Sequence, residues 1–220
     1  MGLVYEGCRM LREFCAENLA GVAEALQAGA RRVELCDDLS VGGVSPSREI
    51  IRQAVGLVHE LGGLVMVMVR PRGGDFAYDD GELAVMEQTI RDARELGADG
   101  VVFGCVRNGE LDLEPLRRLV AGTEGLDLTF HMAFDELASD RQGEALATLA
   151  HMGFSRVLTH GGPLSQPIDA CIPHLRELVR AAHGEIVIMP GGGVTWENAE
   201  AICDDLGVDE AHGTRIVRLP

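Results

Sequence analysis

Short apolar runs alternate along the chain with longer segments in which apolar residues recur at helical spacing. The run at residues 64–69 contains no polar side chain, as is typical of a parallel strand that is covered on both faces. We predict strands at residues 11–15, 32–36, 64–70, 100–105, 126–131, 156–159, 185–189 and 208–212. Such uniform strands, separated by helix-length segments, predict an α/β fold with a parallel sheet.

Seven helices are predicted between these strands, at residues 18–29, 45–61, 79–96, 114–120, 139–151, 168–182 and 195–206. Asn18, Ser45, Asp79 and Thr195 are the expected N-caps. Asp79 and Glu82 have the spacing of a capping box, with aspartate in the place of serine.

Eight strand-to-helix units with right-handed crossovers predict a (β/α)₈ TIM barrel in a single domain, residues 10–220. A doubly wound open sheet is the alternative, but its GxGxxG fingerprint is absent from the first turn. We interpret residues 1–9 as an N-terminal extension. Since the chain ends soon after the eighth strand, the last helix is expected to be short or missing. N-terminal residues or another subunit would then cover part of the barrel wall.

Composition narrows the classes of partner. The 220-residue chain has a net charge of −16, which disfavours nucleic acid and anionic membrane surfaces. No apolar run has the length of a membrane span, and no signal peptide is visible. The six cysteines are scattered without a CxxC pair, so we expect reduced thiols in a cytoplasmic protein.

Charged residues gather where the predicted strands end. Glu13, Glu34 and His212 fall on alternating positions that face the barrel lumen, and Arg70 and His131 end two other strands. A buried charge is costly unless it is paired. One interpretation is a structural ion network in which Arg70 pairs with Glu13 or Glu34. The other is a polar pocket at the carboxyl ends of the strands, where TIM barrels carry their active sites.

The candidate catalytic residues are His131, Asp135 and Glu34. His131 lies in the stretch Phe130-His131-Met132-Ala133-Phe134-Asp135, and Asp135 could orient it as a general base. A metal ligand and a hydrogen-bonded core histidine are the alternatives for His131.

A candidate anion site combines two loops that contain arginine with a glycine triplet that leads into a predicted helix. Free backbone N–H groups at a helix N-terminus suit an anion, and barrel enzymes often bind phosphate after strands seven and eight. The alternative for the triplet is a tight turn that needs positive φ. The predicted anion-binding residues are Arg70, Arg72, Asp75, His160, Gly191, Gly192, Gly193, His212 and Arg215.

Cys15 and Cys36 end neighbouring predicted strands and are the candidate metal ligands. Adjacent strands lie about 4.8 Å apart, so both thiols could bind one soft ion such as Cu(I). Met66 and Met68 alternate on the third strand and could add thioether ligands. Core packing is the alternative role for all four residues.

Several stretches resemble the CutC family of copper homeostasis proteins. They are Glu13-Phe14-Cys15, Val33-Glu34-Leu35-Cys36, Arg70-Pro71-Arg72-Gly73-Gly74-Asp75-Phe76, Thr129 to Asp135, Arg156 to Gly161, and Met189 to Val194. The resemblance spans about residues 10–216. It implies a cytoplasmic TIM barrel, a homo-oligomer (dimer or tetramer), and copper bound at the cysteines that match Cys15 and Cys36.

The chain also departs from the common family pattern. Many members have arginine in the place of Met132 and serine in the place of His160, and a His-Cys-Ser stretch is replaced by His212-Gly213-Thr214. These features resemble a Gram-positive branch of the family. Two functions therefore remain open, with a metal ion or a small anionic molecule as the partner. One is a cytosolic Cu(I)-binding protein, and the other is an enzyme for a small anionic or phosphorylated metabolite.

Overall fold

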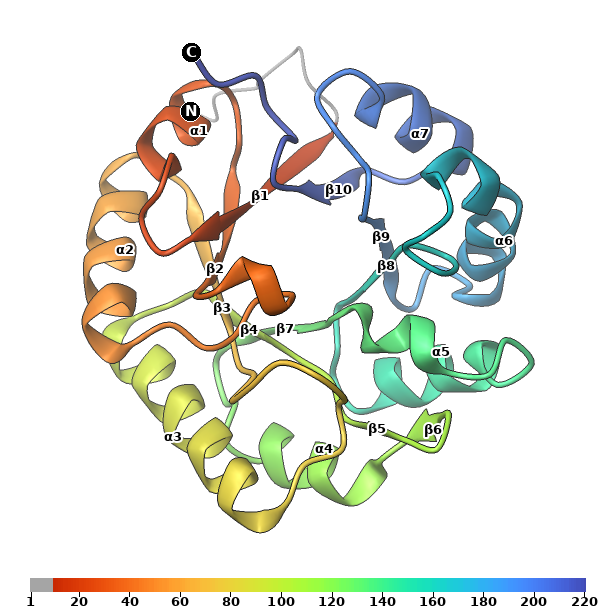
Figure 1. Ribbon diagram of the computed structural model, residues 1–220, viewed down its shortest axis with the longest axis horizontal. Coiled ribbons are helices and arrows are strands. Elements are labelled where there is room, and N and C mark those ends of the chain that lie inside the picture. Colours follow the sequence, from red (N-terminus) through yellow and green to blue (C-terminus); the bar gives the residue numbers. More distant parts are fainter. Residues whose placement is uncertain (1–9) are drawn as a thin grey trace, which may run out of the picture.

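The computed structural model describes residues 10–220, which form a barrel of eight parallel strands (Figure 1). In chain order the strands are β1 (Leu11–Glu17), β2 (Arg32–Cys36), β3 (Leu64–Met68), β4 (Gly100–Phe103), β7 (Asp127–Phe130), β8 (Arg156–Thr159), β9 (Val187–Pro190) and β10 (Glu210–Gly213). From β1 to β9 each strand hydrogen-bonds to the next, and β10 pairs with β1. The barrel is nearly closed, since β9 and β10 lie side by side at its seam. The predicted (β/α)₈ barrel is confirmed.

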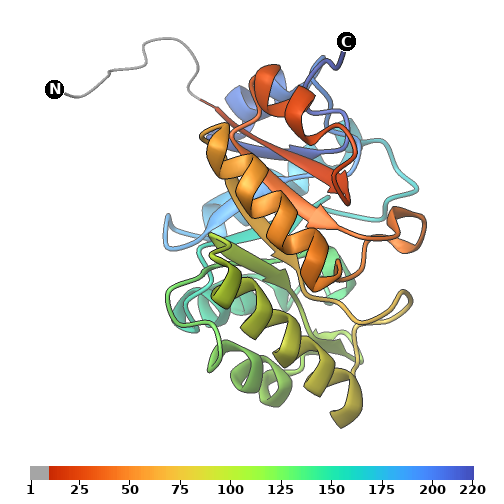
Figure 2. The same ribbon diagram turned by 90° about the vertical axis from the view of Figure 1, so that its left-hand side faces the viewer.

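Seven α-helices surround the strands (Figures 1 and 2). They are α1 (Val22–Gln27), α2 (Arg48–Glu60), α3 (Asp80–Leu96), α4 (Leu113–Val120), α5 (Gln142–His151), α6 (Ile168–Ala181) and α7 (Ala199–Leu206). Two 3₁₀ helices, η1 (Leu39–Val41) and η2 (Met132–Glu136), lie in loops. A small antiparallel hairpin of β5 (Val106–Arg107) and β6 (Glu110–Leu111) precedes α4. None of the helices within residues 10–220 combines the length and the hydropathy needed to cross a bilayer.

One predicted helix start is confirmed and another is wrong. Asp79 caps α3 in a capping box with Glu82, as the sequence indicates. Ser45 does not cap α2, because Ser47 takes that position. The Ser45 hydroxyl instead accepts a hydrogen bond from the backbone N–H of Arg70 at 2.9 Å. Ser45 therefore fixes the loop after β3, next to the mouth of the barrel.

Asn18 is likewise not the N-cap of α1, which begins after Gly21. Asn18 lies in the left-handed region with φ 52°. Its side chain donates to the carboxylate of Asp37 at 3.0 Å. It thus ties the loop after β1 to the loop after β2.

The barrel wall between α1 and α7 is covered by the C-terminal segment instead of a helix (Figure 1). Residues 214–220 contain no helix, so the missing last helix is confirmed. Ile216 and Val217 are buried, and the side chain of Leu219 lies over Gly21. The predicted extension at residues 1–9 lies outside the described residues and stays a prediction.

Apolar residues form two separate clusters, one on each side of the sheet. The larger one fills the layer between the strands and the helices and includes Val33, Val67 and Val101. The smaller one lies inside the barrel and contains Cys15, Cys36, Met66, Met68 and Val102. Four of the five residues of this lumen cluster carry sulfur, and they lie apart from the main core.

Below this sulfur cluster, toward the amino ends of the strands, the lumen contains a layer of buried ion pairs. Arg32 contacts the carboxylate of Glu13 and lies 2.5 Å from that of Glu210. Arg156 pairs with Glu210 at 3.0 Å and with Asp127 at 2.6 Å. Because each buried charge has an opposite partner, the layer can replace an apolar filling of the barrel.

We predict that Arg32→Met destabilises the fold by about 3–5 kcal/mol, because it leaves the carboxylate of Glu13 buried without its arginine. Urea unfolding of wild type and variant measures this difference. Arg176→Met is the matched control. It removes an exposed pair with Asp205, for which a loss of at most about 1 kcal/mol is expected. Equal losses in the two variants would contradict the role of the buried layer.

Candidate functional site at the carboxyl end of the barrel

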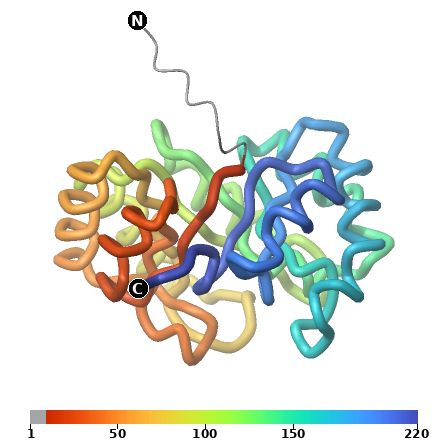
Figure 3. Tube along the Cα trace, turned by 90° about the horizontal axis from the view of Figure 1, so that it is seen from above, coloured from red at the N-terminus to blue at the C-terminus, as the bar shows by residue number. Residues whose placement is uncertain are grey.

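A cavity of about 270 Å³ opens at the carboxyl ends of the strands. Loops around residues 40, 75 and 165 extend on this side of the barrel (Figure 3). The volume is near the lower end of the range for small-molecule sites. Several of the predicted site residues line it, namely Cys15, Glu34, Arg70, His131, Gly192, Gly193, His212 and Arg215.

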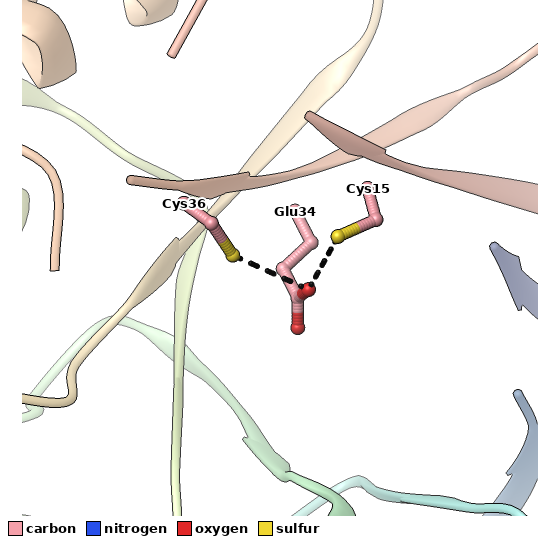
Figure 4. A group of neighbouring side chains, drawn as sticks. All are labelled: Cys15, Glu34 and Cys36. Carbon is pink, nitrogen blue, oxygen red and sulfur yellow. Dashed lines mark hydrogen bonds between the residues drawn. The ribbon is translucent and has the colours of Figure 1, made fainter. Parts of the chain in front are cut away.

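Cys15 on β1 and Cys36 on β2 face the same carboxylate, that of Glu34 (Figure 4). The Oε2 atom of Glu34 lies 3.3 Å from Sγ of Cys15 and 3.5 Å from Sγ of Cys36. The parallel register places Cys15 level with Glu34. Cys36 lies two residues after Glu34 on β2 and therefore on the same face of the strand. All three residues are buried.

His212 on β10 joins this group from the other side. Its Nδ1 lies 2.8 Å from Glu13 Oε1, and its Nε2 lies 3.6 Å from Glu34 Oε2. Burial would lower the pKa of His212, but the surrounding Glu34, Cys15 and Glu13 raise it well above its usual value. His212 is therefore an imidazolium placed between two carboxyl groups.

The two carboxyl groups differ in charge because their partners differ. Burial alone would raise the pKa of Glu13, but Arg32 and His212 outweigh it and lower the pKa to about 2. Burial also raises the pKa of Glu34, and there it prevails over the attraction of His212, so the pKa lies well above the usual range. Glu13 is thus a fixed anion, while Glu34 can hold a proton beside the thiols.

The two thiols are also unequal. Hydrogen bonding from Cys36 lowers the pKa of Cys15 well below its usual value, against the effect of burial. The same contact, together with burial, raises the pKa of Cys36. Cys15 is therefore the more acidic thiol, and it is the one of the two that lines the cavity.

The donor atoms of this group fit a soft metal ion. The ligand atoms of Cys15, Glu34 and Cys36 all lie within 4.8 Å of one another. Two sulfurs on opposite sides of an ion are about 4.6 Å apart if each bond has the Zn–S length of about 2.3 Å. A second group, Glu13, Glu34 and His212, also meets the 4.8 Å limit. Its nitrogen and oxygen donors suit harder ions, but His212 is already bound to both carboxyl groups.

Arg70 lies beside the cavity and is held by backbone carbonyls. Its Nη1 donates to Val41 at 3.0 Å and to Gly43 at 3.1 Å, and its Nη2 donates to Gly74 at 2.7 Å. The guanidinium also lies over the ring of Phe76, 4.7 Å from its centroid. Although only 5% of Arg70 is exposed, its Nε has no hydrogen-bond partner within residues 10–220.

The predicted ion network of Arg70 with Glu13 or Glu34 is wrong. Glu13 is occupied by Arg32 and His212. Glu34 is level with Met66 in the β2–β3 register, so Arg70 lies four residues further along, roughly 13 Å at about 3.3 Å per residue. Arg70 is therefore beyond the layer in which the carboxylates lie.

His131 lies at the end of β7 and is 3% exposed. Its Nδ1 accepts a hydrogen bond from the backbone N–H of Ala133 at 3.2 Å, and its ring packs against Phe76 at 4.8 Å between centroids. A Cβ at Gly104 would lie 2.8 Å from this ring, so glycine makes room for it. Burial, helped by the charge of Arg70, lowers the pKa of His131 to about 3. His131 is neutral.

The glycine triplet lies opposite Arg70 and His131, but it does not lead directly into a helix. Gly192 and Gly193 have φ of 71° and 95° and line the cavity. The helix expected from Thr195 begins instead at Ala199, after Asn198. The predicted helix N-terminus is therefore absent from this loop, and an anion there would meet loop N–H groups.

Two members of the predicted anion site point elsewhere. The guanidinium of Arg72 is bound by the carboxylates of Glu82 and Asp75 and lies over the ring of Tyr78. Neither Arg72 nor Asp75 lines the cavity. The carboxylate of Glu82 belongs to the capping box of α3, which draws Arg72 toward the outer layer.

Asp135 and His160 support the wall behind the cavity. Asp135 does not orient His131, because its carboxylate accepts from the hydroxyl of Thr159 and from the backbone N–H groups of His160 and Gly161. The ring of His160 lies between the carbonyl oxygens of Gly191 and Gln166, at 3.2 Å from each. These residues hold the loops after β8 and β9 in place.

The sequence analysis did not predict that two arginines, Arg32 and Arg156, lie inside the barrel. Arg32 shares the inward positions of Glu34, and Arg156 lies at the start of β8, so period-two alternation was the available signal. It also missed the apolar part of the cavity wall, which includes Met132, Leu158 and Leu164. Those residues come from loops and strand ends whose convergence no local pattern reveals.

Comparison with known proteins agrees with the fold and identifies the family. The sequence model of the CutC family matches residues 10–217. The family protein CutC of Enterococcus faecalis is 46% identical over 209 residues, which are 94% of this chain and all of that protein. The human copper homeostasis protein cutC homolog is 41% identical over 206 residues, covering 92% of this chain and 72% of that protein. A solved structure of CutC from Streptococcus agalactiae has a TM-score of 0.92 at 46% identity and covers 94% of this chain and all of that one.

We predict that His131 makes the protein less stable as pH falls from about 6.5 toward 3. In that window the unfolded chain binds a proton at His131 and the native chain does not, because the native pKa is about 3. Urea unfolding at pH 7.5, 6.5 and 5 should show that His131→Asn loses less stability than wild type, by up to about 2 kcal/mol. His151→Asn, on α5, controls for the loss of a histidine elsewhere. Identical pH dependence in wild type and His131→Asn would contradict the buried neutral imidazole.

Proposed function

Since the chain belongs to the CutC family, we propose that it is a cytoplasmic copper-binding protein that takes part in copper homeostasis. Human and mouse relatives are named copper homeostasis proteins. The single observation that carries the proposal is the buried pair of sulfurs, Cys15 and Cys36, on either side of Glu34. Cu(I) prefers such thiolate ligands.

The surroundings of the two thiols suit a soft ion further. Met66 and Met68 pack against Cys15 and Cys36 in the lumen cluster, so thioether sulfurs are the nearest additional soft donors. Gly213 stands where many family members have a cysteine. Strand β10 therefore supplies no third thiol among the described residues. A two-thiolate site with weak thioether support is therefore the arrangement we propose.

The charged neighbours supply the protons and the compensating charge. Thiols must lose their protons to bind a metal, and Cys15 is already acidic beside Cys36 and the His212 imidazolium. The carboxyl group of Glu34 lies within 3.5 Å of both sulfurs, and because burial raises its pKa it can stay protonated there and add no further negative charge. Two thiolates facing an imidazolium keep the buried charge close to neutral when a monovalent cation is bound.

We predict one Cu(I) per chain under reducing conditions, bound by Cys15 and Cys36. Cys15→Ser and Cys36→Ser should each weaken binding by roughly 100-fold or more, beyond the 10–100-fold typical of outer-shell partners. Affinity should fall as pH is lowered, because protons compete for the thiolates. Competition with a Cu(I) chelator under anaerobic conditions measures all three effects.

Cys203→Ser is the matched control for this experiment. Cys203 is a buried thiol on α7, outside the lumen, and its Sγ lies near the carbonyl of Glu210. Its loss should leave Cu(I) binding unchanged. A Cys15→Ser/Cys36→Ser double variant that binds Cu(I) as tightly as wild type would refute the proposed site.

We further propose that the protein forms a homo-oligomer, a dimer or a tetramer. The barrel wall near the seam is covered by the C-terminal segment without a helix, and partly exposed Trp196 and Leu219 lie on it. Arg218 stacks on Trp196, 5.3 Å from the ring centroid. This leaves an apolar surface that a second copy could cover.

Light scattering at micromolar concentration tests the oligomer. We expect a mass of two or four chains, and Trp196→Glu should shift the population toward smaller species by placing a charge in the contact. Monomer mass alone for the wild type would contradict the proposal.

A further inference from the structure

We propose that the cavity at the barrel mouth binds a small molecule through an oxyanion group, a carboxylate or a phosphate. Arg70 and His131 would bind this group from one side, and Arg215 with the backbone of Gly192 and Gly193 from the other. This site is separate in its ligands from the thiol pair, although Cys15 lies in the same cavity wall.

Arg70 has unused donors in a place where no protein carboxylate meets it. A guanidinium carries five N–H donors, and three are used by the carbonyls of Val41, Gly43 and Gly74. Two donors remain, the buried Nε–H and one N–H of Nη2. Arg70 also interacts with the buried hydroxyl of Tyr78, so the N–H of Nη2 is the donor left for a ligand. Buried donors are normally satisfied by protein or water, and an oxygen acceptor is the missing partner of this one.

The other buried arginines show what Arg70 lacks. Arg32 and Arg156 each contact two carboxylates within 4 Å. Arg70 has no such ion pair within residues 10–220, despite the −16 charge of the whole chain. Three carbonyls and an aromatic face hold its guanidinium in a fixed orientation without neutralising it. The positive charge therefore remains for a ligand.

His131 adds a donor of fixed direction. Because its Nδ1 accepts from the N–H of Ala133, the proton of the neutral ring is on Nε2. This Nε2 is buried and has no hydrogen-bond partner in the described part of the chain. Phe76 packs against both His131 and Arg70, so the two unsatisfied donors belong to one neighbourhood.

The opposite wall also offers donors and positive charge. No hydrogen bond within residues 10–220 uses the backbone N–H groups of Gly192 and Gly193. Successive N–H groups in such turns form concavities that bind anions. Arg215 is an exposed residue that lines the cavity, and its guanidinium has no salt-bridge partner among the described residues.

The other residues that line the cavity indicate the size and polarity of the rest of the ligand. Phe76, Met132, Leu158 and Leu164 supply apolar lining, and the volume of about 270 Å³ suits a small metabolite. Leu164 is 67% exposed and lies at the rim, where it would cover a bound molecule. The geometry thus selects a small compound with one anionic end and an apolar or neutral remainder.

Thermal melts and calorimetric titrations of metal-free, full-length protein test this site with inorganic phosphate and with acetate, at ionic strength matched by chloride. We expect phosphate, acetate or both to raise the melting temperature of wild type. Losing one charge-assisted hydrogen bond weakens binding at least about tenfold. His131→Asn and Arg215→Met should therefore each raise the dissociation constant by that factor. Asparagine can still accept from the N–H of Ala133, so His131→Asn keeps the turn, while its shorter side chain leaves no donor at the position of Nε2.

Arg72→Met is the matched control, because Arg72 is a neighbouring arginine that binds Glu82 outside the cavity. It should respond to the anions as wild type does. Arg70→Met should abolish binding, and the two other variants decide the outcome if it does not fold. Phosphate also stabilises proteins generally by exclusion from their surface. An equal shift in wild type and all variants, or no shift in wild type, would therefore overturn the proposal.

This result is independent of copper. Cys15→Ser should lose Cu(I) binding and keep the anion response, and His131→Asn should do the reverse. A loss of the anion response in Cys15→Ser with no loss in His131→Asn would assign the anion to the thiol group and overturn the site proposed at Arg70.

Discussion

The structure depends on keeping buried charge balanced inside a nearly closed barrel, and Glu13 has the central place in that balance. Its carboxylate contacts Arg32 below and His212 above. It thereby joins the ion-pair layer near the amino ends of the strands to the thiol group near the carboxyl ends. Arg32 and His212 lower the pKa of Glu13 to about 2. Glu34, Cys15 and Glu13 together raise the pKa of His212, and Cys36 and then His212 lower the pKa of Cys15.

The same balance separates two kinds of positive charge in the lumen. Arg32, Arg156 and His212 are neutralised by carboxyl groups and support the fold. Arg70 is oriented by carbonyl oxygens and keeps its charge free beside the cavity. A thiol pair that suits a soft cation and an arginine that suits an oxyanion therefore share one opening. The sequence left two functions open, copper binding and catalysis on an anionic metabolite. They would use different residues at the same mouth of the barrel.

The sequence predicts the barrel and the convergence of its strand ends, because both follow from local periodicity and chain order. Glu13, Glu34, Arg70, His131 and His212 do meet around one cavity or directly beneath it. The pairing among them could not be predicted, since it depends on register. The register between β1 and β2 places Arg32 level with Glu13. Arg70, in contrast, lies beyond the end of β3. Side-chain contacts of the loops could not be predicted either. Arg72, for example, binds Glu82 in the capping box of α3 instead of facing the cavity.

X-ray absorption spectroscopy of the Cu(I)-loaded protein at the copper edge tests the central claim most directly, because it identifies the atoms bound to the metal. The structure predicts a first shell of two sulfur atoms, from Cys15 and Cys36, that is lost in the Cys15→Ser/Cys36→Ser variant. A shell of nitrogen and oxygen alone, or a sulfur shell that survives in that variant, would contradict the assignment of copper to the lumen thiols.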